Sequence, residues 1–351
     1  MTRTFDLRQG VESGLAESIA ARLAAGEVGI VPTETVLGLV AAVSRPEACQ
    51  RIFDIKGRDQ AKLLPWMTAH PQTALSQVHK SRVAAKLARV LWPGPLTMVL
   101  GDGAGQAWRV PDHKFLHDVL LECKGPIVAT SANRSGAPAP VAAESIDPEL
   151  LAAVDFAVLD HPTRTATPST VVRVNQRDGV EILRPGAILE SRVVLLAQYR
   201  IEVICSGNTC RSPLAAAMLR RELQDEPSVA ISSCGTSCDS GSPVSQGSLH
   251  AAAARGLDLR GHLSRGLPED LAEADLVLCM TDHHRDRVLQ HCAPHGAPQR
   301  TELLSTSNQA IADPWGGDDE DYECLANNLE PHVKAWGAFV RNHLAETRAG
   351  E

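Results

Sequence analysis

A strand, a short loop and a helix start afresh near residue 200, after more than half of this 351-residue chain. Residues 201–204 are predicted as a strand and residues 213–223 as a helix, while Arg184-Pro185-Gly186 ends the pattern before them. One compact domain uses about 150 residues, so the length also favours two. We therefore predict one domain over residues 1–195 and a second over residues 196–351.

Composition indicates what kind of core each domain can build. Hydrophobic residues make up 44% of the chain, but aromatic residues make up only 3%. Packing must therefore come mainly from Ala, Val, Leu and Ile, which favours α/β layers over an aromatic-rich β-sandwich. The net charge of −8 excludes the basic excess of a dedicated nucleic-acid-binding protein, although it leaves room for local basic clefts.

Cysteine content and apolar runs bear on the compartment. The chain has nine cysteines, an odd number, and a chain of this length does not need disulfides to fold. Both points favour a reducing compartment. No window reaches the roughly 18 to 20 apolar residues of a membrane span, and the N-terminus has no signal-peptide core. We expect a cytoplasmic protein that makes no membrane contact.

Helical and strand patterns alternate in the first domain. Helical spacing covers residues 15–25 and 84–91. Short apolar runs predict strands at residues 28–31, 127–130, 156–159, 170–174 and 180–183. The last two are joined by Asn-Gln-Arg-Asp-Gly, a sequence typical of a turn. We predict a mixed α/β domain with some antiparallel pairing.

The second domain continues the alternation of strand and helix. Strands are predicted at residues 229–232 and 276–280, and a helix at residues 320–344. This order is typical of a small doubly wound parallel sheet.

The most informative segment of the second domain is Cys205-Ser206-Gly207-Asn208-Thr209-Cys210-Arg211-Ser212. A loop that closes onto a helix N-terminus turns its N–H groups inward and forms an anion site. We predict that Arg211 grips phosphate and that Cys205 is an ionised nucleophile, because the same donors stabilise a thiolate. The other predicted phosphate-binding residues are Ser206, Gly207, Asn208, Thr209, Cys210 and Ser212. The alternative is a buried structural cysteine before a helix cap.

Further short segments extend this pattern along the second domain. They are Ser233-Cys234-Gly235-Thr236, Gly256-Leu257-Asp258, His262, Ser264-Arg265, Ala274-Asp275, Met280-Thr281 and Asp313-Pro314. With the Cys205 segment, they resemble the low-molecular-weight protein-tyrosine-phosphatase family over residues 200 to about 346. The resemblance implies a phosphorylated protein substrate, a cysteinyl-phosphate intermediate at Cys205, and Asp313 as the general acid that later activates water. It implies no metal and no cofactor for this domain.

Two residues bear on the phosphatase subclass. Thr209 stands where tyrosine-specific members carry a bulkier aliphatic residue and where members similar to protein arginine phosphatases carry Thr. Trp315, followed by two glycines, replaces paired aromatics that wall a phenol ring. Both departures favour phosphoarginine over phosphotyrosine, since Asp313 could meet a planar guanidinium.

Other cysteines leave two alternatives open. Arsenate reductases of the same fold carry relay thiols, and Cys279 lies near one relay position, but Asp286 stands where the second is expected and Cys292 is too distant. That chemistry is the less favoured interpretation. Cys210 either forms a protective disulfide with Cys205 on oxidation or simply fills the loop.

Several histidines gather after residue 280. They are His283, His284, His291 and His295, with Cys292 among them. Their spacing matches no tight four-ligand metal pattern. We predict a solvated helix face and no metal.

Small hydroxyl groups and cations recur at strand ends in the first domain. Pro32-Thr33-Glu34-Thr35, Lys56-Gly57-Arg58 and Ser131-Ala132-Asn133 are three such groups. Taken together they predict a cleft for a polyanion, although singly they suit a solvated cation pair or a helix cap.

Four further segments extend this pattern: Trp92-Pro93-Gly94-Pro95-Leu96-Thr97, Arg109-Val110-Pro111, Ser169-Thr170 and Arg184-Pro185-Gly186. Together with the groups above, they resemble the YrdC-like threonylcarbamoyl-AMP synthase family over residues 10 to about 190. The resemblance implies a twisted mixed α/β fold that condenses L-threonine, bicarbonate and ATP, with Mg²⁺ accompanying the ATP. The product would supply tRNA-modification machinery.

The resemblance also implies roles for individual residues. Those near threonine and the carbamoyl group would be Thr35, Arg109 and Ser169. Those along the nucleotide would be Lys56, Arg58, Lys62, Ser131, Asn133 and Arg184. Leu37, Asp59 and His161-Pro162 depart from the family pattern. A catalytically degenerate module that binds nucleotide or RNA and regulates the phosphatase is therefore the alternative.

Overall fold

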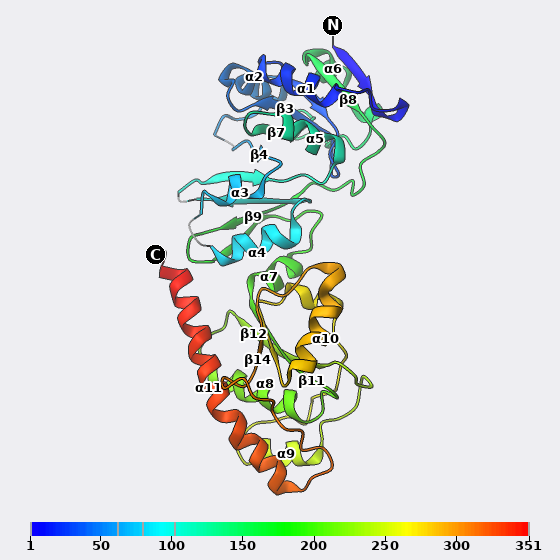
Figure 1. Ribbon diagram of the computed structural model, residues 1–351. Helices are drawn as coiled ribbons and strands as arrows, with labels where there is room; N and C mark the ends of the chain where they lie inside the picture. Colours follow the sequence, from blue (N-terminus) through cyan, green and yellow to red (C-terminus); the bar gives the residue numbers. More distant parts are fainter. Residues whose placement is uncertain (1, 62, 79–80, 102, 350–351) are drawn as a thin grey trace. The chain divides into compact units, whose positions relative to one another are not determined.

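The computed structural model describes residues 2–61, 63–78, 81–101 and 103–349. Contacts divide the chain into two compact units, of which the first includes the residues up to Leu195 and the second covers Leu196–Glu346 (Figure 1). The division falls inside helix α7 (Glu190–Ala197). Each unit is described separately below.

The first unit contains a ten-stranded mixed sheet with the strand order β1-β8-β2-β3-β7-β4-β6-β5-β9-β10. The strands are β1 (Arg3–Asp6), β2 (Gly29–Val31), β3 (Gly38–Ala42), β4 (Trp66–Met67), β5 (Leu96–Leu100), β6 (Gln106–Arg109), β7 (Ile127–Ser131), β8 (Phe156–Leu159), β9 (Thr170–Val174) and β10 (Val180–Arg184). Its helices are α1 (Leu15–Ala24), α2 (Pro46–Lys56), α3 (Pro71–Leu75), α4 (Arg82–Leu91), α5 (Lys114–Glu122) and α6 (Pro148–Ala153). The mixed α/β fold is confirmed.

Two apolar clusters hold helices against the central strands of this sheet. In one, Ile19 of α1 and Leu116 of α5 pack with Val40 of β3. In the other, Ile52 of α2 and Leu150 of α6 pack with neighbouring strand residues. Aliphatic side chains make up most of both clusters, as the composition predicts.

The predicted hairpin is present at one end of the sheet. Strands β9 and β10 pair antiparallel with Val180 opposite Val174, and Asp178 in the turn has a φ of 61°. A positive φ is unfavourable for most residues but is tolerated by Asp, so the Asn-Gln-Arg-Asp-Gly turn fits its sequence.

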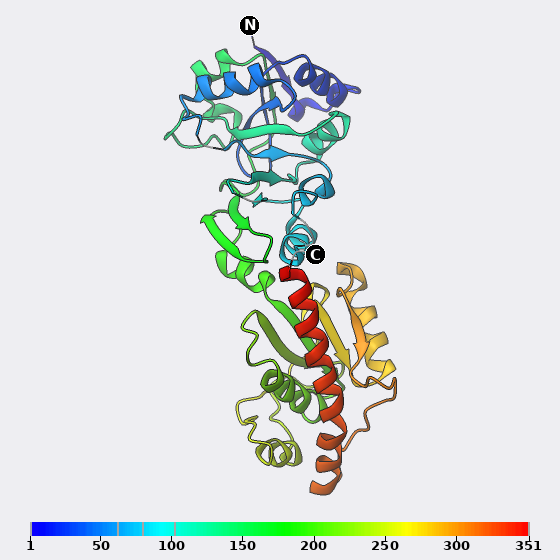
Figure 2. The same ribbon diagram turned by 90° about the vertical axis from the view of Figure 1, so that its left-hand side faces the viewer.

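The second unit is built on a four-stranded parallel sheet with the order β12-β11-β13-β14. The strands are β11 (Tyr199–Cys205), β12 (Val229–Gly235), β13 (Leu276–Cys279) and β14 (Thr301–Leu303). Its helices are α8 (Arg211–Glu222), α9 (Gln246–Ala253), α10 (Asp282–Cys292) and α11 (Asp319–Ala349) (Figure 2). The doubly wound parallel sheet is confirmed.

Helices cover both faces of this smaller sheet. Leu214 of α8 and Val340 of α11 share one apolar cluster with Val203 of β11. Val288 of α10 shares a second cluster with Ile204, the next residue of β11. Neighbouring strand residues point to opposite faces, so this alternation places β11 at the centre of the unit.

Helix α8 begins two residues earlier than predicted. It starts at Arg211, so Pro213 is its third residue and does not occupy the first helical position. Proline is accepted there because the first N–H groups of a helix have no partner within the helix.

Among the described residues, no helix combines the length and hydropathy that a membrane crossing requires.

Candidate active sites

The thiol of Cys205 lies at the carboxyl end of β11, directly before the loop that leads into α8. Cys205 is 2% exposed. The backbone N–H of Asn208 donates to its Sγ at 3.2 Å, and the Ser212 hydroxyl lies 3.0 Å from the same sulfur. Donors of this kind stabilise a thiolate, so the loop is suited to hold a nucleophile.

Asn208 holds the loop in shape. Its φ is 54°, and its amide nitrogen donates to the hydroxyls of Ser212 at 3.0 Å and Ser233 at 2.9 Å. The backbone N–H of Arg265 donates to Asn208 Oδ1 at 3.0 Å, and His262 Nε2 lies 2.8 Å from the Asn208 carbonyl oxygen. Three separate segments therefore fix one residue of positive φ beneath the loop.

Arg211 is buried and lies against the loop and a second segment. Its guanidinium donates to the Ile311 carbonyl at 3.2 Å and to Ser206 Oγ at 3.3 Å, and it forms an ion pair with Asp313. The Asp313 side chain is 43% exposed, so the carboxylate lies at the mouth of the site.

The three predicted catalytic residues border one cavity of about 380 Å³. It is lined by Cys205, Ser206, Gly207, Thr209, Cys210, Arg211, Ser237, Cys238, Asp239, Ser242, Asp313 and Trp315. Asn208 and Ser212 lie behind this lining, where they contact the cysteine sulfur. The structure therefore brings the predicted residues together, and it adds Ser237, Cys238, Asp239 and Ser242 from the segment after β12.

His284 was not among the predicted site residues, although it contacts the phosphate loop. Its Nε2 lies 2.9 Å from Ser206 Oγ and its Nδ1 lies 2.8 Å from Thr281 Oγ1. His284 is buried, and this burial, together with the charge of Arg211, lowers its pKa to about 4. The prediction of a solvated helix face is thus wrong for His284. Its position three residues after the helix-capping Thr281 was the available signal.

Cys279, the candidate relay thiol, is poorly placed for that chemistry, whereas Cys210 and Cys238 line the catalytic cavity. Cys279 is fully buried, and burial raises its pKa to about 12. Cys210 Sγ is 3.6 Å from both Thr209 Oγ1 and the Tyr322 hydroxyl. All nine cysteines are free, and the described residues contain no His, Cys, Asp and Glu cluster that could hold a metal.

In the first unit, a cavity of about 140 Å³ opens at the ends of several strands. Five predicted residues line it: Arg58, Arg109, Ser131, Ser169 and Arg184. The Ser169 hydroxyl lies 2.8 Å from Thr97 Oγ1, and Arg184 donates to the Ser169 carbonyl at 2.7 Å. Thr97 also lines the cavity but was not predicted as a site residue.

Three arginines give this cavity its positive charge. Burial lowers the pKa of Arg184 from its ordinary value, and the charges of Arg109 and Arg58 lower it further. Burial likewise lowers the pKa of Arg58. Cations packed this closely favour a bound polyanion, which would offset their mutual repulsion.

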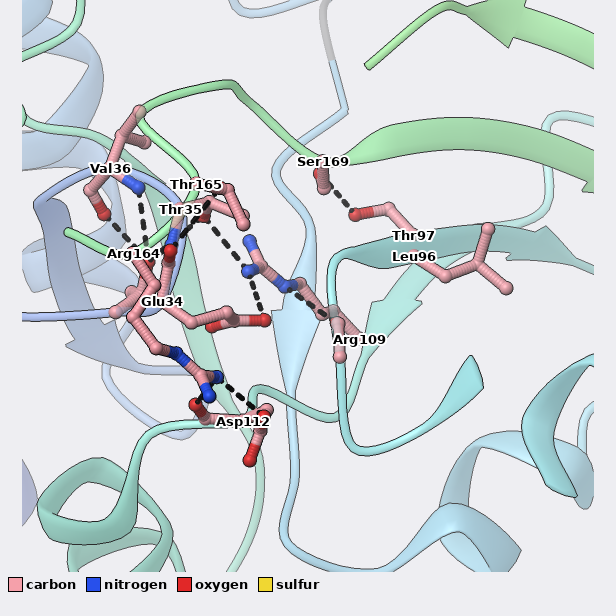
Figure 3. A network of polar contacts seen from close by, with 12 residues as sticks. Glu34, Thr35, Val36, Leu96, Thr97, Arg109, Asp112, Arg164, Thr165 and Ser169 are labelled. Atoms are coloured by element: carbon pink, nitrogen blue, oxygen red, sulfur yellow. Dashed lines mark hydrogen bonds and ion pairs between the residues drawn. The ribbon is translucent and has the colours of Figure 1, made fainter. Parts of the chain in front are cut away.

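Glu34 is a further residue that the sequence did not single out. Its carboxylate lies 2.7 Å from a guanidinium nitrogen of Arg109, which also donates to Thr35 Oγ1 at 2.9 Å (Figure 3). Glu34 and Thr35 are buried beneath the loop that carries Thr165, whose backbone N–H donates to the Glu34 carbonyl at 3.0 Å. Thr35 therefore reaches the cavity through Arg109.

Lys56 occupies a different environment from the one expected. Its ammonium donates to the carbonyls of Ser131 and Asn133 and lies 3.2 Å from Asn133 Oδ1. Burial lowers its pKa to about 8, and Arg58 contributes to the same shift. Lys56 and Asn133 do not line the cavity but hold the segment after β7. Lys62 lies outside the described residues.

Comparison with known proteins matches each unit to a separate family. The Sua5/YciO/YrdC family model, described as telomere recombination, matches residues 21–186. The model of low molecular weight phosphotyrosine protein phosphatases matches residues 200–346. A threonylcarbamoyl-AMP synthase from Homo sapiens is 30% identical over 54% of this chain and 74% of its own length. A protein-arginine-phosphatase from Geobacillus stearothermophilus is 34% identical over 38% of this chain and 89% of its own length.

The chain belongs to both families. It therefore joins a Sua5/YrdC-type domain to a low-molecular-weight phosphatase domain, and both families are enzymatic. A structure of Sua5 from Pyrococcus abyssi is similar at a TM-score of 0.51 and 20% identity, covering 95% of this chain and 98% of that one. At this identity the similarity concerns the fold alone.

Proposed function

We propose that residues 196–351 form a cysteine-dependent protein phosphatase. The observation that supports this most strongly is the shared cavity of Cys205, Arg211 and Asp313. Arg211 would hold two phosphate oxygens with its planar fork, while the sulfur lies beneath them. This reaction needs no metal.

The proposed reaction runs in two displacements. The Cys205 thiolate attacks phosphorus, the bond to the leaving nitrogen or oxygen breaks, and Asp313 transfers its proton to that atom. Asp313 then accepts a proton from water, whose oxygen attacks the cysteinyl phosphate and releases inorganic phosphate and the thiolate. Because Asp313 pairs with Arg211 as a carboxylate in the free protein, it must leave this ion pair when phosphate binds and take up a proton from solvent before it acts as the acid.

We propose phosphoarginine as the favoured substrate. The carboxylate of Asp239 lines the cavity beside the acid Asp313 and would attract a guanidinium group, which a phenol lacks. Trp315 is 74% exposed and stands alone where paired aromatics would enclose a phenol. The similarity to a protein-arginine-phosphatase adds support. The test compares kcat/KM for phosphoarginine and phosphotyrosine peptides of equal sequence, and higher values for tyrosine would contradict the proposal.

For residues 1–195 we propose synthesis of threonylcarbamoyl-AMP from L-threonine, bicarbonate and ATP. The observation that carries this proposal is the cavity lined by Arg58, Arg109 and Arg184. Charge builds on the α-phosphate as pyrophosphate leaves, and fixed cations stabilise that charge. Since arginines and hydroxyls line the cavity, Mg²⁺ would be bound by the ATP phosphates.

The proposed residue roles are those that the resemblance to the YrdC-like family implies, applied to residues that line or support the cavity. Arg109 and Ser169 would contact threonine and the carbamoyl group, and Thr35 would act through Arg109. Arg58, Ser131 and Arg184 would lie along the nucleotide. Lys56 and Asn133 would brace the nucleotide side from behind.

The decisive assay measures pyrophosphate released from ATP by the full chain, with and without L-threonine and bicarbonate. Release that depends on threonine supports the synthase. ATP binding without release would instead favour a regulatory nucleotide-binding module, for which the Leu37 departure is the motivation.

A further inference from the structure

We propose that a second pocket beside the catalytic cavity binds an acidic side chain of the phosphorylated protein, so that the phosphatase selects sites with Asp or Glu near the phosphoresidue. This inference rests on the proposed phosphatase function. The pocket has a volume of about 460 Å³. It is lined by Gly235, Thr236, Ser237, Cys238, Gly266, Leu267, Arg287, Gln290 and His291.

The two pockets share a wall. Ser237 and Cys238 line both the catalytic cavity and the second pocket. This wall is tied to the phosphate loop, because the backbone N–H of Thr236 donates to the Cys205 carbonyl at 3.0 Å and that of Ser237 to the Ser206 carbonyl at 3.1 Å. A substrate held at Cys205 would therefore cross this wall to enter the second pocket.

The ionisable side chains of the second pocket, other than the shared Cys238, are basic. Arg287 is exposed on α10, and His291 lies one turn further along the same helix, where its Nε2 is 3.0 Å from the Pro268 carbonyl oxygen. No carboxylate is among the residues that line this pocket. The catalytic cavity, in contrast, is lined by Asp239 and Asp313. The charge of the second pocket thus suits an anionic side chain.

Two glycines line the pocket, and one of them, Gly266, faces open space. Gly235 lies directly under the loop, where a Cβ would come within 2.4 Å of the Ser206 carbonyl oxygen. Gly266 pairs with Gly235 in an isolated β-bridge, and a Cβ at Gly266 would meet no atom within 4 Å. The space above Gly266 is therefore available to a side chain of the substrate.

The geometry also limits where the acidic residue lies in the substrate. An extended peptide advances about 3.3 Å per residue, with alternate side chains on opposite faces. Because Ser237 and Cys238 line both pockets, we expect the acidic residue within about three positions of the phosphoresidue.

The first test uses phosphopeptides in which Glu, Gln or Lys scans three positions on each side of the phosphoresidue. We expect kcat/KM to be at least about fivefold higher for Glu than for Lys at one position. The variant Arg287→Glu should reverse this order. Arg285→Glu is the matched control, since it makes the same charge change on the same helix at a residue that pairs with Asp282 and does not line the pocket.

A second test fills the pocket without changing its charge. Gly266→Leu places a side chain in the open space, so the preference for Glu should disappear while turnover of free phosphoarginine and p-nitrophenyl phosphate stays unchanged. Equal kcat/KM for the Glu and Lys peptides, or an unaltered ratio in Arg287→Glu, would overturn the inference. If the wild-type protein turned over neither free phosphoarginine nor p-nitrophenyl phosphate, the result would contradict the proposed phosphatase activity itself.

Discussion

The carboxylate of Glu34 lies 2.7 Å from the guanidinium of Arg109, and both side chains are buried. A buried cation that loses its partner remains desolvated, which makes this ion pair sensitive to substitution. The pair also determines where Arg109 points, since Thr35 accepts a hydrogen bond from the same nitrogen.

Glu34→Gln should therefore affect L-threonine and ATP, two of the three substrates of the proposed synthase, to different degrees. Without the carboxylate, Arg109 loses its fixed orientation, so kcat/KM for L-threonine should fall at least about tenfold, which corresponds to about 1.4 kcal/mol. The binding of ATP should be no weaker, because the substitution makes the cavity more positive. Steady-state kinetics with each substrate varied in turn measure the difference. Glu34→Asp serves as the conservative control, and equal losses for both substrates would contradict a positioning role.

Cys205→Ser should abolish phosphatase turnover but keep phosphate within about threefold of its wild-type affinity, because the loop and Arg211 remain. Peptide turnover and phosphate titration by calorimetry measure the two effects. The control is Cys210→Ser, which removes a neighbouring thiol that contacts Tyr322. Full activity in Cys205→Ser would exclude a covalent mechanism.

Thr209→Ile should move the substrate preference towards phosphotyrosine. Thr209 lines the catalytic cavity, and isoleucine replaces its hydroxyl with apolar bulk that can pack against a phenol ring. The measurement is the ratio of kcat/KM for phosphoarginine and phosphotyrosine peptides, which we expect to fall several-fold. An unchanged ratio would remove Thr209 as a determinant of specificity.

Protonation of His284 should destabilise the fold in mildly acidic solution. Its pKa is lowered to about 4 in the folded chain, against an ordinary value near 6.5. The unfolded chain therefore binds the proton first, so the free energy of unfolding falls as the pH drops from about 6.5 to about 4, by up to about 1.4 kcal/mol per pH unit. Urea titrations at several pH values in this range give the free energy of unfolding of the wild type and of His284→Gln. We expect this free energy to depend less steeply on pH in the variant. An equal dependence of the free energy of unfolding on pH in both proteins would show that His284 is not the group involved.

Contiguous features were predictable from sequence, while contacts between distant segments were not. The loop from Cys205 to Ser212 could be recognised because the nucleophile and its anion site lie within eight residues between a strand and a helix. The hairpin β9–β10 was predictable from its turn for the same reason.

Glu34, Thr97 and His284 depend on tertiary contacts. Glu34 meets Arg109 across 75 residues, and His284 meets Ser206 across 78. Lys56 shows the reverse case, since its charge suggested a ligand contact while its surroundings direct it to backbone carbonyls. Sequence alone could not determine these environments, because each is created when separate strands and helices pack together.

The ion pair between Arg211 and Asp313 has a consequence for selectivity in the proposed mechanism. In the free protein the Asp313 carboxylate already occupies the position of an anion beside Arg211. A monovalent anion such as chloride or acetate would therefore bind only weakly in its place. A phosphoryl dianion can outcompete the carboxylate, and its binding releases Asp313, which takes up a proton from solvent and then serves as the acid. Asp313 thus becomes available as the general acid only when the phosphoryl group of the substrate is bound.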